Sequence, residues 1–141
     1  MKLDLSSLQK AVESLQKTIK VSEDKTFTAG LDEDAKDAVR AGVIQNFEFT
    51  YELCWKFMRR WLKENAEVEE AEYPRTRKEL FRLAARFGLI KEPLPWFTYG
   101  DARNLTSHTY DEDKAESVYE TAVYFIKDAK YLLERLQERN D

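Results

Sequence analysis

The sequence predicts an all-α fold, namely an antiparallel up-and-down bundle of four main helices with an additional short helix. Apolar residues recur at intervals of three and four along nearly the whole chain, which places them on one face of each helix. No segment alternates apolar and polar residues for long enough to form a half-buried strand. The connectors are short, so consecutive helices are expected to be antiparallel neighbours. The chain of 141 residues is long enough for one domain with a substantial core, which we place over residues 1–141.

The first helix is expected to begin near Asp4 or Ser6. Its buried stripe follows the helical spacing and consists of Leu5, Leu8, Val12, Leu15 and Ile19. The segment KTFTAG is predicted to break this helix, with Gly30 as the strongest local stop.

A second helix of roughly 30 residues, about 45 Å long, is expected from the segment LDEDAKD onward. The acidic residues of that segment suit the positive end of the helix dipole. The apolar face of this helix is wide and aromatic, and we interpret it as core rather than as a cofactor site. It consists of Val43, Ile44, Phe47, Tyr51, Cys54, Trp55, Met58, Trp61 and Leu62. A face this wide requires neighbouring helices on more than one side.

A third helix is expected after the acidic connector ENAEVEEAE. Thr76 and Glu79 match a capping box at its start, and Gly88 suits the position just beyond its end. Its inner face is expected to consist of Leu80, Leu83, Ala84 and Phe87.

Two more helices complete the predicted bundle. A short fourth helix is expected from about Pro95 toward Arg103, and it carries Trp96, Phe97 and Tyr99. The last helix is expected to start in the segment YDEDKAE, where either Thr109 with Glu112 or Asp113 with Glu116 matches the pattern of its cap. Its inward residues are expected to be Val118, Ala122, Phe125, Ile126, Ala129, Leu132, Leu133 and Leu136.

The composition argues against several classes of protein. The single cysteine, Cys54, can form no disulfide within the chain, and with only one histidine beside it a structural zinc site is not expected. We therefore expect no metal and no organic cofactor. A net charge of −4 argues against a protein that coats nucleic acid over a broad surface. No signal peptide or membrane-spanning run is recognisable, so a cytoplasmic location is expected.

Basic residues are nevertheless concentrated on the third predicted helix. Lys78, Arg82 and Arg86 recur every four residues and therefore form one stripe. The stripe is either a solvated helix face or a surface for RNA phosphates or for an acidic partner.

The segment RNLTSHTY, residues 103–110, holds the only histidine of the chain. On a continuous helix Asn104 and His108 would share a face, with Arg103, Ser107 and Tyr110 on the adjacent stripe. The expected cap of the following helix places His108 and Tyr110 at a helix–helix corner, where side chains can turn toward a cleft.

Two interpretations of this segment remain open from its spacing. One is a hydrogen-bonded cluster at a helix end. The other is a reactive site, because imidazole transfers protons near neutral pH and arginine stabilises charge on a phosphate. Together these groups suit cleavage of a phosphodiester by the adjacent ribose 2′-hydroxyl, which needs no metal. Since that reaction uses both a base and an acid, a symmetric homodimer would supply the second histidine.

The spacing of Arg103, His108 and Tyr110 resembles the R-x4-H-x-Y signature of HEPN domains. Three blocks in order are similar to the nucleotidyltransferase substrate-binding branch of that family: QNFEFTYELCWKFMRRWL (45–62), YPRTRKELFRLAARFGLI (73–90) and RNLTSHTYDEDKAESVY (103–119). The resemblance covers about residues 5–137. It implies a helical bundle that dimerises, with the signature segments of two subunits in a shared cleft. It also implies a small nucleotidyltransferase as partner, in a pair of toxin–antitoxin type.

The resemblance also implies roles for individual residues. In toxin members of the family the signature is a metal-independent ribonuclease site. Arg103 would then bind and stabilise the scissile phosphate, His108 would act as acid or base, and Asn104 would orient one of them. Tyr110 matches the tyrosine that the partner enzyme silences by attaching adenylate.

Two alternatives to a ribonuclease toxin remain. The chain is either a noncatalytic subunit that docks the nucleotidyltransferase and a nucleotide or acceptor, or a helical dimerisation module without a small-molecule role. The ribonuclease interpretation expects RNA cleavage that depends on His108. The binding-subunit interpretation expects a stable complex with the partner and no cleavage by the dimer alone.

Overall fold

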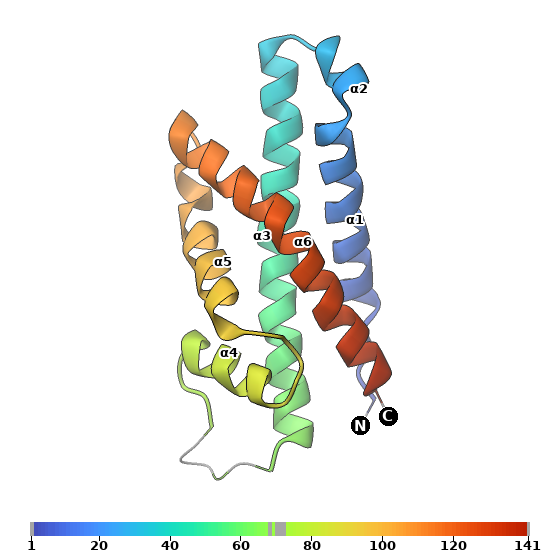
Figure 1. Cartoon of the computed structure of the whole chain (residues 1–141), viewed down its shortest axis with the longest axis vertical. Coiled ribbons are helices and arrows are strands. Elements are labelled where there is room, and N and C mark those ends of the chain that lie inside the picture. The colour runs from blue at the N-terminus through green and yellow to red at the C-terminus, as the bar shows by residue number, and fades with distance from the viewer. Residues whose placement is uncertain (1, 68, 70–72, 141) are drawn as a thin grey trace.

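The computed structural model describes residues 2–67, 69 and 73–140. Within these residues every regular element is a helix, so the predicted all-α fold is confirmed (Figure 1). In chain order the elements are α1 (Ser6–Glu23), α2 (Lys25–Ala29), α3 (Glu33–Asn65), α4 (Arg77–Arg86), α5 (Pro93–Leu105), the short 3-10 helix η2 (Thr106–His108) and α6 (Glu112–Glu138).

Helices α1 and α3 run side by side in opposite directions, and α6 crosses both of them on its way back to the chain ends (Figure 1). Residues near the two ends of the chain are joined directly. The Leu3 N–H donates to the side-chain oxygen of Asn140, and the Asn140 amide donates back to the Leu3 carbonyl, both at 2.8 Å.

The first helix ends earlier than Gly30, and the segment KTFTAG is not a simple break. Asp24 leaves helical geometry, and its carboxylate accepts a hydrogen bond from the Phe27 N–H at 3.1 Å. This cap starts the additional five-residue helix α2, which the sequence patterns did not predict. Gly30 then ends α2 rather than α1.

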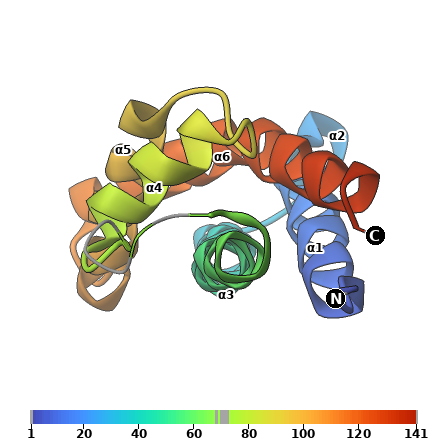
Figure 2. The same cartoon turned by 90° about the horizontal axis from the view of Figure 1, so that it is seen from below.

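Helix α3 forms the centre of the fold. It begins where Asp32 caps the Ala35 N–H at 2.8 Å, and it continues for 33 residues. Viewed along its axis, α3 has α1 on one side, α4 and α5 on the other, and α6 behind it (Figure 2). The expectation of neighbours on more than one side is confirmed. One face of α3 is left uncovered, and Phe49 on α3 is 60% exposed.

Helix α4 has the predicted local signals at both ends. Thr76 accepts from the Glu79 N–H at 3.1 Å, and the Glu79 carboxylate accepts in return from the Thr76 N–H at 3.4 Å. Gly88 follows the helix with a φ of 76°, a left-handed conformation that favours glycine.

Helices α5 and α6 meet at the corner that carries the signature. Pro93 occupies the first turn of α5, so this helix starts two residues before the predicted Pro95. The cap of α6 is Asp111, whose carboxylate accepts from the Asp113 N–H at 3.0 Å and from the Lys114 N–H at 3.2 Å. The two predicted caps, which start from Thr109 and from Asp113, are therefore wrong, because the extended backbone of Asp111 places its own carboxylate over the helix end.

The core is aromatic, as the wide apolar face of α3 predicted. Phe125 of α6 lies edge-on to Phe47, Trp96 and Tyr99, with ring centroids 5.2, 5.5 and 4.9 Å away. Cys54 is fully buried among the core residues, and burial raises the pKa of its thiol well above the usual range. Among the described helices, none combines the length and the apolar composition that a membrane crossing requires.

Candidate functional site

The signature segment spans the end of α5, the 3-10 helix η2 and the turn into α6. The α-helix ends at Leu105, so the chain forms the helix–helix corner that the sequence predicted. Asn104 and His108 are exposed, and Tyr110 is 85% exposed. The chain changes from an α-helix to a 3-10 helix at Thr106. Asn104 and His108 therefore do not share one face of a continuous α-helix.

A close approach of two helices positions Arg103. Gly100, one turn before Arg103 on α5, lies so near α3 that an added Cβ would stand 2.9 Å from the Tyr51 hydroxyl. An added Cβ at position 100 would therefore require the Tyr51 side chain to shift. The last turn of α5 is consequently held against the middle of α3.

Two carboxylates of α3 hold the Arg103 guanidinium. Arg103 Nε donates to Glu52 at 3.0 Å, and Arg103 Nη1 lies 3.8 Å from Glu48. Arg103 Nη1 also donates to the Thr106 hydroxyl at 3.2 Å. The Arg103 side chain is 30% exposed, so one edge of it remains accessible to a ligand. The guanidinium is thus fixed in direction before any substrate binds.

Sequence reasoning missed both carboxylates. Glu48 and Glu52 are four residues apart and share a face of α3. That spacing was the available signal, but it is also typical of solvated glutamates in long helices. Nothing in the local sequence indicates which distant arginine they meet.

The His108 imidazole lies in solvent beside the phenol of Tyr110. Their ring centroids are 6.2 Å apart in an edge-to-face arrangement. The backbone carbonyl of His108 accepts from the Asp111 N–H at 3.1 Å, which closes the turn into α6. His108 and Tyr110 are therefore presented together on one exposed turn.

An arginine of α3 ties down the start of α6, two residues after Tyr110. Arg40 donates to both carboxylate oxygens of Glu112, at 2.6 and 2.9 Å, and lies 3.5 Å from Glu116. This pairing lowers the pKa of Glu112 and raises that of Arg40. A two-point arginine–carboxylate contact restricts the geometry of the corner.

Asn104 lies in the last turn of α5, next to Arg103 in the sequence. It lines a shallow cavity of about 140 Å³, together with Arg77, Lys78, Phe97 and further residues of α3, α4 and α5. The structure thus places Asn104 toward α4, while Arg103 contacts α3.

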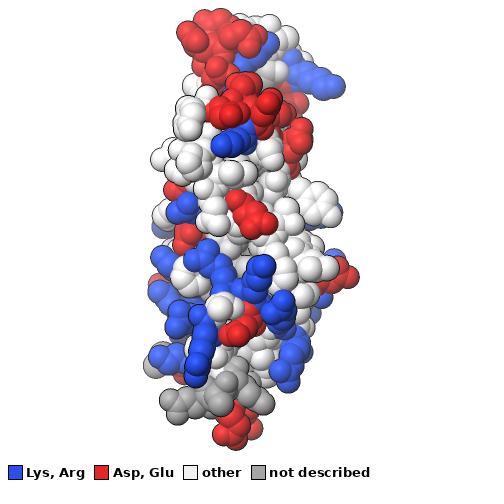
Figure 3. Space-filling view, turned by 90° about the vertical axis from the view of Figure 1, so that its left-hand side faces the viewer, with Lys and Arg blue, Asp and Glu red and all other residues white. Residues whose placement is uncertain are grey.

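The predicted basic stripe is exposed along α4. Lys78 and Arg82 both lie over the Phe97 ring, each 5.4 Å from its centroid, and Arg86 is exposed one turn further on. Lys and Arg gather over the lower half of this face of the molecule, whereas Asp and Glu gather at its upper end (Figure 3). On this face, most of the positive charge therefore lies in the lower half (Figure 3).

Metal chemistry has no donor set in the described ranges. Residues 2–67, 69 and 73–140 contain no group of three or more His, Cys, Asp or Glu side chains arranged to hold an ion. The signature residues of the corner carry an imidazole, a guanidinium, an amide and a phenol.

A family model and a curated protein both match nearly the whole chain. The family model described as "Nucleotidyltransferase substrate binding protein like" matches residues 3–138. A Haemophilus influenzae protein named "Probable ribonuclease HepT" is 40% identical over 139 residues, which cover 99% of this chain and 95% of that protein.

Solved structures agree with these matches. A Haemophilus influenzae structure, described as revealing the fold of a substrate-binding domain of a nucleotidyltransferase, has a TM-score of 0.89 and 38% identity, and the match covers 95% of this chain and 99% of that one. A crystal structure of a Thermus thermophilus protein has a TM-score of 0.69 and 27% identity, and the match covers 90% of this chain and 98% of that one. This chain therefore belongs to the family of nucleotidyltransferase substrate-binding proteins, as its signature and sequence blocks suggested.

Proposed function

We propose that the chain is a metal-independent endoribonuclease of toxin type, paired with a small nucleotidyltransferase. The observation that carries this proposal is the corner itself. It exposes His108 to solvent and holds the Arg103 guanidinium in a fixed direction with one accessible edge. The ribonuclease name of the 40% identical relative supports the same activity.

The proposed reaction is attack of a ribose 2′-hydroxyl on the adjacent phosphorus. A base removes the 2′-hydroxyl proton, the oxygen forms a new bond to phosphorus, and the bond to the 5′-oxygen breaks. An acid protonates that leaving oxygen, which yields a 2′,3′-cyclic phosphate and a 5′-hydroxyl. In this scheme His108 moves the protons and Arg103 stabilises the charge on the phosphate oxygens. Asn104 would orient one of these two side chains.

A homodimer would supply both an acid and a base, since each chain has one histidine. The uncovered face of α3 is the candidate contact. Phe49, 60% exposed, lies on α3 between Glu48 and Glu52, the two residues that hold Arg103. Two copies that pack on this face would bury Phe49 and bring their two corners to one cleft.

Tyr110 is the proposed point of control. At 85% exposure its hydroxyl is accessible to a second enzyme. The hydroxyl oxygen would attack the α-phosphorus of ATP, pyrophosphate would leave, and the phenolic proton would pass to the partner enzyme. The resulting adenylate adds a negative charge next to the His108 ring, whose centroid is 6.2 Å from that of Tyr110. It would therefore repel and obstruct an RNA phosphate at the corner.

The direct test is RNA cleavage by the purified protein in the presence of a chelator. Wild type should cut and leave cyclic phosphate ends, and His108→Ala should not. Because His108 is exposed, the variant should keep the thermal unfolding temperature of wild type, so a loss of cleavage would not reflect misfolding. Equal cleavage by the two proteins would end the ribonuclease proposal.

A second candidate function is a noncatalytic subunit that binds the nucleotidyltransferase and its substrate. The family description favours it, and so does the pairing of Arg103 with Glu48 and Glu52, which offsets the charge of the guanidinium. This function predicts a stable complex with the co-expressed partner and no RNA cleavage by either wild type or His108→Ala. Failure of the two proteins to copurify would contradict it.

A further inference from the structure

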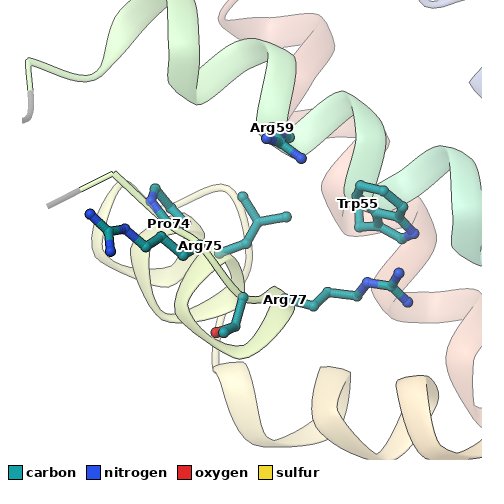
Figure 4. A pocket seen from close by; sticks show the side chains of 7 residues that line it. Trp55, Arg59, Pro74, Arg75 and Arg77 are labelled. Carbon is teal, nitrogen blue, oxygen red and sulfur yellow. The ribbon is translucent and has the colours of Figure 1, made fainter. Parts of the chain in front are cut away.

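A separate arginine-lined cavity lies at the lower end of the molecule, between α3 and the start of α4. It has a volume of about 170 Å³ and is lined by Trp55, Arg59, Pro74, Arg75, Thr76, Arg77 and Leu80 (Figure 4). Three of these residues carry guanidinium groups, one carries an indole, and none of the described lining residues carries a carboxylate. The lining thus combines positive charge with an aromatic surface.

Two backbone donors just before α4 are already used within the protein. The Glu79 carboxylate accepts from the Arg75 N–H at 2.8 Å and from the Thr76 N–H at 3.4 Å. The charged groups that the lining offers to an anion are the arginine side chains.

Aromatic rings hold one of these arginines in place. The Arg77 guanidinium lies 4.5 Å from the centroid of the Trp55 ring and 5.7 Å from that of Tyr51, and it donates to the Tyr51 hydroxyl at 3.4 Å. Stacking on a ring orients a guanidinium without neutralising it. Arg77 is thus fixed in place while its charge remains available.

The three guanidinium groups are spread across the cavity. The Arg77 guanidinium lies on the side of Trp55, Arg59 projects from α3, and the Arg75 side chain extends away from Trp55 (Figure 4). The volume is also below the roughly 300–1,000 Å³ of pockets that enclose a small-molecule ligand. A spread of charges around a small cavity suits part of an extended polyanion better than an enclosed small molecule.

The cavity is connected to the signature in two ways. Arg77 also lines the neighbouring cavity of about 140 Å³ that contains Asn104. In addition, the Trp55 indole N–H donates to Glu52 at 2.9 Å, and Glu52 accepts from Arg103 at 3.0 Å. Trp55 and Glu52 are one helical turn apart on α3. The arginine cavity is therefore adjacent to the site that holds Arg103.

We propose that this cavity binds the phosphate backbone of an RNA strand, whose neighbouring phosphates continue past Arg77 and Asn104 toward Arg103. The assignment of RNA rests on the proposed ribonuclease function. The cavity is an anchoring site, and Arg59, Arg75 and Arg77 take no part in bond breaking. Guanidinium groups match phosphate oxygens in two-point contacts, which accounts for three arginines in place of lysines.

The test measures binding of a short fluorescein-labelled RNA in which every sugar is 2′-O-methylated, so that cleavage is blocked. Fluorescence anisotropy compares wild type with the double variant Arg59→Glu/Arg75→Glu. The matched control is Lys17→Glu/Lys20→Glu, which makes the same change in net charge at exposed residues of α1. Arg77 is left unchanged, because its stacking on Trp55 and Tyr51 contributes to packing.

The arginine variant should bind roughly tenfold more weakly than the control, and its salt dependence should be shallower by about one unit of log K per log of salt concentration. Equal affinity of the arginine variant and the control would overturn the site. Unlabelled RNA should displace the probe from wild type, whereas poly-glutamate and ATP should not do so at equal phosphate or carboxylate concentration. Displacement by poly-glutamate would indicate an acidic protein partner, and displacement by ATP a free nucleotide, and either result would overturn the RNA assignment.

The binding measurement does not depend on catalysis, because the 2′-O-methylated probe cannot be cut. If wild type and His108→Ala cleaved RNA equally, the ribonuclease proposal would fail while the arginine cavity kept its support from the binding data. If cleavage depended on His108 but the arginine variant bound like the control, only the anchoring site would fail.

Discussion

Arginine side chains are held in two different ways at the two candidate sites of this molecule. At the corner between α5 and α6, Arg103 is paired with Glu52 at 3.0 Å. At the base of α4, Arg77 lies over the ring of Trp55, 4.5 Å from its centroid. A carboxylate fixes the guanidinium and offsets its charge, whereas an aromatic ring fixes it and leaves the charge in place. We infer that the corner fixes the direction of the Arg103 guanidinium, whereas the start of α4 attracts an anion through the charge of Arg77.

The largest effect is expected on catalysis, when Arg103, the arginine that is paired with a carboxylate, is replaced. Arg103→Lys keeps the positive charge but loses the planar, two-point donor geometry that a phosphate needs. If Arg103 stabilises the transition state, the single-turnover rate of RNA cleavage should fall roughly 10²–10³-fold. The free energy of unfolding should change by less than about 1 kcal/mol, since a partly exposed ion pair contributes little to stability. A cleavage rate within a few-fold of wild type would show that geometry at Arg103 is not required.

The second effect concerns stability, at the C-terminal end of α4. Gly88 ends α4 with a φ of 76°, and an added Cβ there would stand 3.0 Å from Arg139 Nη2. Gly88→Ala should therefore lower the free energy of unfolding by about 1–2 kcal/mol, measured by denaturant titration. The matched control is Gly42→Ala in the middle of α3, where an added Cβ meets nothing within 4 Å.

The control should instead stabilise the protein by about 0.5–1 kcal/mol, because alanine restricts the unfolded chain and glycine weakens a helix interior. The same direction of change in both variants would contradict the assigned role of Gly88.

The ends of the helices and the two candidate sites differ in how far the sequence predicted them. Both ends of α4 were predicted, because the partners Thr76 and Glu79 lie within one helical turn and Gly88 is required by a local backbone conformation. The same local rules misplaced the start of α6, where Thr109 and Asp113 offered caps that compete with Asp111. They also missed α2, since Asp24 was not considered as a cap.

The candidate site was predicted only as a list of residues. The identities and order of Arg103, Asn104, His108 and Tyr110 are visible in the sequence, and so is the corner that exposes them. The partners of Arg103 are not, because Glu48 and Glu52 are about 50 residues away and meet it only through the packing of α5 on α3. The arginine cavity could not be predicted for the same reason. Trp55 and Arg59 belong to α3, whereas Arg75 precedes α4 and Arg77 is its first residue.

A smaller effect is expected from removing the charge that offsets Arg103. Glu52→Gln loses the negative charge and keeps one acceptor oxygen in place of the two that receive the Arg103 and Trp55 donors. RNA binding at the corner should strengthen roughly twofold to fivefold, because one repulsive carboxylate is gone. Cleavage at saturating RNA should slow by a similar factor, because a neutral partner holds the guanidinium less firmly.

The matched variant for this prediction is Glu48→Gln. Glu48 lies 3.8 Å from the guanidinium, compared with 3.0 Å for Glu52, so both changes should be smaller. Binding and rate that move in the same direction for Glu52→Gln would show that this carboxylate does not position Arg103 in the way we propose.

The smallest expected effect is the pH dependence of the pair that anchors the corner. Arg40 lowers the pKa of Glu112, so the folded protein releases this proton more readily than the unfolded chain, whose glutamates titrate near about 4.3. The pair therefore contributes stability that is fully present above that pH and is lost as the pH falls through the lowered pKa of the folded state. Thermal unfolding temperatures of wild type and Glu112→Gln should differ at neutral pH and converge in strong acid. Arg40→Gln should remove the same portion of the pH dependence, and the double variant should remove no more than either single change. If the difference in unfolding temperature between wild type and Glu112→Gln stayed constant down to strong acid, Glu112 would stabilise the corner by packing alone. Arg103 would then be the only arginine of this comparison that is held by charge pairing.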